Sequence, residues 1–141
     1  MVFLLHWSPP MGTIGDQRER RPRVLSATKI IGAGVRNPLG EDLGKVEELM
    51  IDLESGRITY AVLSFGGFLG LGDKLFAIPW QALTLAADEG VYVLNVDRAV
   101  LEQAPGFDRK HWPDMSEPTF QTTVYGHYGY SYTPTSSYSP R

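Results

Sequence analysis

The sequence from Val24 to Pro113 repeats one pattern, in which short runs of β-branched and aromatic residues alternate with turns of Gly, Pro, Asn and Asp. Runs of roughly four to eight such residues are typical of strands joined by hairpins, whereas amphipathic helices need longer periodic segments. A chain of 141 residues has room for one domain with one hydrophobic core. We therefore predict a mainly β fold: a small barrel of short antiparallel strands, with one short C-terminal helix and extended terminal arms.

The individual runs give the expected strands. The segment 58–65 is apolar at both odd and even positions, so we expect a central strand that is covered on both faces. Alternation fails within the segment 45–52, and a β-bulge near Glu48 would restore it. Gly56 suits the tight turn of a hairpin between these two segments. The complete set of expected strands is 34–36, 45–52, 58–65, 75–78 and 91–96.

Two short helices are expected beside the strands. Ser26 and Asp97 are residues that favour helix N-termini, and they precede the segments 27–30 and 98–104. Pro105 would end the second of these helices. Two tryptophans next to prolines, Trp80 and Trp112, are expected to bury their rings and close the ends of the barrel.

The composition divides the chain into an N-terminal arm (1–23), a barrel domain (24–113) and a C-terminal tail (114–141) that is rich in Tyr, Gly, Ser and Pro. The arm shows no strand or helix period, yet it carries apolar side chains, each of which would gain about 1.5 to 3 kcal/mol from burial. We expect them to dock on another surface. Residues 121–141 of the tail are expected to be disordered on their own, because low-complexity segments bury too little apolar area. The residues of the arm expected to make this contact are Phe3, Leu4, Leu5 and Trp7.

Charge is distributed unevenly along the chain. Residues 24–113 carry eight basic and twelve acidic side chains, so the barrel should repel a phosphate backbone. Binding of nucleic acid is therefore expected only through the basic cluster of the arm, if at all. Cysteine is absent, and the apolar run 2–5 is too short to cross a bilayer, so we expect a soluble, cytoplasmic protein without disulfides. The basic cluster consists of Arg18, Arg20, Arg21 and Arg23.

Three segments in order resemble one known family. The motif GEDLGKVEELMIDLESGRI (40–58), the strand YAVLSFGG (60–67) and the tetrapeptide AIPW (77–80) are similar to PRC-barrel domains, especially those of the bacterial stand-alone branch. The resemblance implies a small β-barrel without a common enzymatic activity. It also implies kinship with the cytoplasmic domain of the photosynthetic reaction-centre H subunit and with the C-terminal domain of the ribosome maturation factor M, which serves docking. Both terminal segments fall outside the resemblance.

Searches for catalytic and ligand-binding patterns favour structural explanations. The glycine-rich loop 66–72 lacks the Lys-Ser/Thr pair of a phosphate-binding loop. Acidic residues such as Glu41 and Asp52 fall at turns without a calcium-loop spacing, and the three histidines are scattered. We therefore predict no catalytic residue, no metal site, no cofactor and no enzymatic activity.

The leading hypothesis is a protein-binding and assembly module that associates with copies of itself through its arms. One alternative is an adaptor that docks on a larger ribosomal or photosynthetic complex, and another is a barrel that binds a small ligand inside. Proteins are the expected partners in the leading hypothesis, and apolar or aromatic residues are the expected contacts. These residues are Phe3, Leu4, Leu5, Trp7, Phe68, Leu69, Leu71, Tyr125, Tyr128, Tyr130 and Tyr132.

Overall fold

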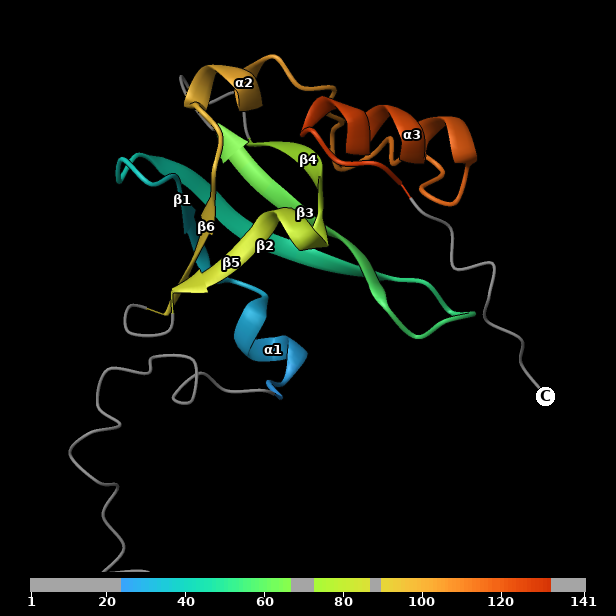
Figure 1. Cartoon of the computed structure of the whole chain (residues 1–141), viewed down its shortest axis with the longest axis horizontal. Helices are drawn as coiled ribbons and strands as arrows, with labels where there is room; N and C mark the ends of the chain where they lie inside the picture. Colours follow the sequence, from blue (N-terminus) through green and yellow to red (C-terminus); the bar gives the residue numbers. More distant parts are fainter. Residues whose placement is uncertain (1–23, 67–72, 87–89, 133–141) are drawn as a thin grey trace, which may run out of the picture.

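The protein folds into one curled six-stranded sheet that closes as a half-barrel (Figure 1). This is a computed structural model, and it describes residues 24–66, 73–86 and 90–132. The strands follow one another in the order β4-β3-β2-β1-β6-β5. Their bounds are β1 (Gly34–Arg36), β2 (Asp42–Ile51), β3 (Ile58–Gly66), β4 (Asp73–Pro79), β5 (Leu83–Ala86) and β6 (Val91–Leu94).

The predicted mainly β, barrel-type fold is confirmed, and each of the five predicted strands is present. Three features differ from the expectation. Strand β5 was not predicted, the pair of β1 and β6 is parallel while the others are antiparallel, and β3 lies second from the edge of the sheet. The parallel pair arises because curling brings the last strand of the sequence beside the first, a contact that local patterns do not encode.

The hairpin of β2 and β3 has the local geometry that the sequence predicts. The pairing register shifts between Val46 and Glu48, which places a bulge where alternation fails. Gly56 in the connecting turn has φ +76°, a left-handed conformation that glycine adopts without strain. A second shift between Met50 and Ile51 alters the register again just before the turn.

Side chains cover both faces of β3, as predicted. Ala61, Leu63 and Phe65 point to one side of the sheet and belong to the larger core cluster. Tyr60 and Val62 point to the opposite side and belong to a second cluster. The sheet therefore has an apolar layer on each side, so it needs a cover on its convex face as well.

That cover is a helix that the sequence did not predict. Helix α3 (Pro118–His127), most of which falls in the segment 121–141 that was expected to be disordered, lies across β3 and β4 and buries Val124 and Tyr125 in the second cluster. The expectation was wrong there because it weighed low-complexity composition and overlooked the large area that two side chains can bury. Pro118 at the first turn and Gly129, with φ +83°, mark the ends of the helical segment.

The shorter helices occur where they were expected. Helix α1 (Ala27–Ile30) precedes β1, and α2 (Arg98–Glu102) follows β6. A 3₁₀ turn, Trp80–Ala82, lies between β4 and β5. Ser26 and Asp97 have the extended backbone of N-cap residues, but neither makes a side-chain cap hydrogen bond. None of the described helices is long and apolar enough to cross a membrane.

The two tryptophans differ in environment. Trp80 packs against the larger core cluster, with its ring 5.8 Å from that of Tyr92. Trp112 remains 40% exposed and contacts Phe107, with 5.1 Å between the ring centres. The expected burial of both rings is therefore met in part by Trp80 and less by Trp112. Residue 112 lies in the segment that crosses toward α3, where one side of the ring faces solvent.

Candidate functional site

A groove lies between the tip of the β2–β3 hairpin and the segment 114–121, which comprises the turn before α3 and the first turn of that helix. The hairpin extends beyond the rest of the sheet, and the start of α3 lies on the same side of the molecule (Figure 1). The cavity between them has a volume of about 610 Å³. We call it the hairpin groove. Its lining residues are Met50, Ile51, Asp52, Leu53, Glu54, Thr59, Tyr60, Asp114, Met115, Ser116, Gln121 and Tyr132.

The hairpin wall is held by hydrogen bonds within the turn. Asp52 and Arg57 close the hairpin, where the Asp52 N–H donates to the Arg57 carbonyl at 2.8 Å. The Asp52 carboxylate also accepts bonds from the Glu54 N–H at 2.9 Å and the Ser55 hydroxyl at 3.1 Å. With its polar groups satisfied locally, the turn holds Leu53 outward, where this side chain is 94% exposed.

The opposite wall is fixed by the turn that precedes α3. Asp114 accepts hydrogen bonds from the Ser116 hydroxyl at 2.6 Å and the Ser116 N–H at 3.0 Å. These bonds favour the charged carboxylate and lower the pKa of Asp114. The Gln121 side chain donates to the Met115 carbonyl at 3.2 Å, which ties this turn to the helix. The Met115 side chain is buried in the second core cluster.

Tyr60 forms the floor of the groove, and two further aromatic rings pack against it without lining the groove themselves. Tyr60 is buried and meets Phe120 and Tyr125 edge-on, with ring centres 5.9 and 5.7 Å away. Tyr125 donates its hydroxyl to the Thr59 carbonyl at 3.0 Å, whereas the Tyr60 hydroxyl has no hydrogen-bond partner among the described residues. Burial raises the pKa of both phenols, so both stay neutral at physiological pH. The floor is thus rigid, apolar and uncharged.

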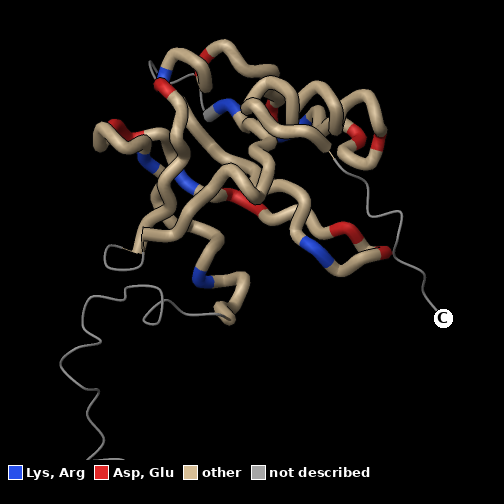
Figure 2. Tube along the Cα trace, viewed as in Figure 1, with Lys and Arg blue, Asp and Glu red and all other residues tan. Residues whose placement is uncertain are grey.

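The rim of the groove is acidic. Asp52, Glu54 and Asp114 are the charged residues in its lining, and they come from both walls. Figure 2 shows acidic positions on the hairpin tip and, across from them, at the start of α3. The turn between β2 and β3 also contains Arg57, which is not in the lining. The groove therefore combines an apolar floor with a negative rim.

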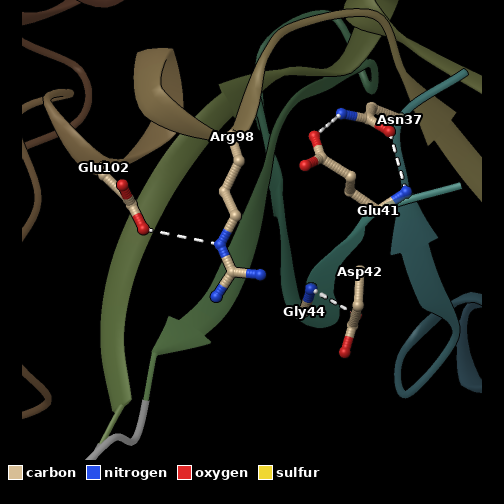
Figure 3. A network of polar contacts seen from close by, with 6 residues as sticks. All are labelled: Asn37, Glu41, Asp42, Gly44, Arg98 and Glu102. Carbon is tan, nitrogen blue, oxygen red and sulfur yellow. Dashed lines mark hydrogen bonds and ion pairs between the residues drawn. The ribbon is translucent and has the colours of Figure 1, made fainter. Parts of the chain in front are cut away.

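A second polar cluster lies at the other end of β2 (Figure 3). Buried Asn37 donates from its side chain to the Glu41 carboxylate at 2.6 Å and accepts from the Glu41 N–H at 2.9 Å. Arg98 lies over the Phe65 ring at 5.0 Å and pairs with Glu102 at 3.4 Å. These contacts fix the β1–β2 turn and the start of α2, so they explain the acidic turn residues as structural.

Among the described residues, no group of three or more His, Asp or Glu side chains is placed to hold a metal ion. His111 pairs with Asp108 at 2.8 Å on the exposed surface. The His127 ring lies 3.1 Å from the Val100 carbonyl oxygen and so connects α3 to α2. Both histidines therefore have structural partners.

The predicted contact residues lie in different environments. Tyr125 is buried in the second core cluster, and Tyr128 is partly buried against it. Tyr130 is exposed, and Tyr132 lines the hairpin groove. The remaining predicted contacts and the arginine cluster lie outside the described residues. They are Phe3, Leu4, Leu5, Trp7, Phe68, Leu69, Leu71, Arg18, Arg20, Arg21 and Arg23.

Sequence reasoning missed Ile51 and Leu53 as surface residues. Ile51 had been placed inside the predicted strand 45–52, and Leu53 had been assigned to neither strand nor turn, although Ile51 is 53% exposed beside the second register shift. An available signal was the pair of apolar residues next to the turn 54–57, where a chain ordinarily places polar side chains. The facing wall could not be found this way, because it lies about sixty residues further along the chain.

The fold and the groove define a small half-barrel domain with an apolar core and a groove on its surface. The model of the PRC-barrel domain family matches residues 22–101, which is more than half of the chain, and the protein belongs to this family. Domains of this family are in general non-catalytic and mediate protein interactions. No curated protein matches the chain.

Proposed function

We propose that the protein is a non-catalytic assembly module that associates with copies of itself through its terminal arms. The observation that carries the proposal is the exposure of Ile51 and Leu53 at the mouth of the hairpin groove. Large apolar side chains that rim a cavity mark a contact surface, whereas isolated ones need no explanation. The groove therefore supplies an apolar surface for a partner.

The arms supply a matching segment. Residues 1–23 combine a cluster of large apolar side chains near the start with four arginines, a composition that fits an apolar groove with an acidic rim. We propose the division of the chain into the arm (1–23), the barrel (24–113) and the tail (114–141), with α3 as the part of the tail that completes the barrel.

The particle size of the purified full chain tests the proposal. Light scattering after size-exclusion chromatography, from about 1 to 100 μM, should show a mass that grows with concentration. Deleting residues 1–22 should reduce that growth and leave the thermal unfolding transition of the barrel in place. A monomer at every concentration would instead favour an adaptor that docks on a different protein complex.

A further inference from the structure

The hairpin groove has the size and chemistry of a site for a short peptide segment. Its volume of about 610 Å³ lies within the range of roughly 300 to 1,000 Å³ that ligand sites occupy. Met50, Leu53 and Tyr132 supply apolar surface from both sides, and the aromatic floor is held rigid by ring contacts. A partner with one or two large apolar side chains fits such a site.

The charge of the rim narrows the choice of partner. Asp52, Glu54 and Asp114 all carry negative charge, so a basic segment gains affinity and an acidic one is repelled. Among the chain's own segments outside the described residues, 1–23 carries four arginines against two acidic residues, while 133–141 carries Arg141 alone. The N-terminal arm is therefore the better complement.

We propose that the hairpin groove binds the N-terminal arm of a second copy of this chain. The inference rests on the proposed self-association, and it names the receiving site. Phe3, Leu4, Leu5 and Trp7 of the arm provide the side chains for the apolar floor, and the arginines after them lie along the acidic rim. Trp7 and Arg18 are eleven positions apart, and such a segment spans up to roughly 36 Å when extended. Both parts of one arm can therefore contact the same groove.

Photo-cross-linking from the groove identifies the occupant directly. The full chain is prepared with p-benzoylphenylalanine in place of Leu53, an exposed position where the replacement leaves the core intact. Copies labelled with ¹⁴N and ¹⁵N are mixed, irradiated and digested, and the cross-linked peptides are identified by mass spectrometry. We expect cross-links to residues 1–23 that join the two isotopes. Cross-links to 133–141, or to the arm of the same copy, would overturn the proposal.

Matched surface variants measure the contribution of each part of the groove. Leu53→Ser should weaken assembly by on the order of tenfold, because it removes an apolar contact at the mouth. Leu39→Ser is the control, since Leu39 is also exposed but lies in the β1–β2 turn. Glu54→Lys should weaken assembly and Glu48→Lys should not, although both are exposed glutamates and the net charge changes equally.

Charge reversal on both the arm and the groove tests whether the two contact each other directly. Arg20→Glu with Arg21→Glu should weaken assembly alone, and it should recover assembly when combined with Glu54→Lys. If deletion of 1–22 abolishes assembly while Leu53→Ser and Glu54→Lys leave it unchanged, the groove is wrong and self-association stands. A wild-type chain that stays monomeric would refute both.

Discussion

Gly44 is the position where a single methyl group should have the largest effect on the barrel. It lies in β2 with φ +103°, a conformation that an L-residue adopts at a cost of about 1 to 2 kcal/mol. A Cβ atom there would overlap the Ser64 carbonyl oxygen and lie 3.2 Å from the Phe65 Cα atom. Because both atoms belong to the backbone of β3, the side chains cannot simply move aside.

Relief of this overlap must open the pairing of β2 with β3 near Lys45 and Ser64. The loss of one or two ladder hydrogen bonds adds about 1 to 2 kcal/mol, so Gly44→Ala should lower the free energy of unfolding by about 2 to 4 kcal/mol. Gly56→Ala is the matched control, because its φ is +76° but no atom lies within 4 Å of the added Cβ. The control should lose about 1 kcal/mol, from strain alone.

Urea unfolding followed by circular dichroism compares the two variants, provided that each unfolds in one cooperative step. The midpoint of Gly44→Ala should fall well below that of Gly56→Ala, with similar slopes. Equal midpoints would refute the close approach of β2 and β3 at this position, and with it the bulged register on which the geometry of the hairpin depends.

Three further predictions concern the layers around β3. Tyr60→Phe should leave the free energy of unfolding unchanged or raise it slightly, because the buried hydroxyl has no hydrogen-bond partner among the described residues. Tyr125→Phe should lower the free energy of unfolding by about 1 kcal/mol, because it removes the hydrogen bond to the Thr59 carbonyl. Urea unfolding compares the two variants. Arg109 bonds Glu47 at 2.8 Å and lowers its pKa. The contribution of this pair is present at neutral pH and is lost as pH falls through that lowered pKa, so Arg109→Gln should reduce the loss of stability on acidification, as thermal melts from about pH 6 to pH 3 would show. Deletion of 121–141 should lower the melting temperature sharply by uncovering the convex face, while deletion of 133–141 should not.

The sequence was most informative where a pattern is local. Alternation and its failure near Glu48 predicted strand, bulge and turn, because each depends on a few adjacent residues. The parallel pairing of β1 with β6 could not be predicted, since it depends on how the whole sheet curls. Helix α3 was missed for a related reason: Val124 and Tyr125 are informative only beside the face of β3 that they cover. The groove depends on the second of these errors, because the segment that leads into α3 supplies one of its walls.

The two walls of the hairpin groove have different origins, and this bears on what the protein recognises. The wall of Ile51 and Leu53 lies within residues 22–101, the part that matches the family, whereas the wall of Asp114 and Met115 lies beyond it. A site that needs both walls is therefore a property of this chain's C-terminal segment as much as of the barrel. The same segment covers the convex apolar layer, so stability and recognition are coupled through α3. Substitutions on its buried side should alter folding and assembly together, while exchanges of Leu53 or Glu54 should alter assembly alone.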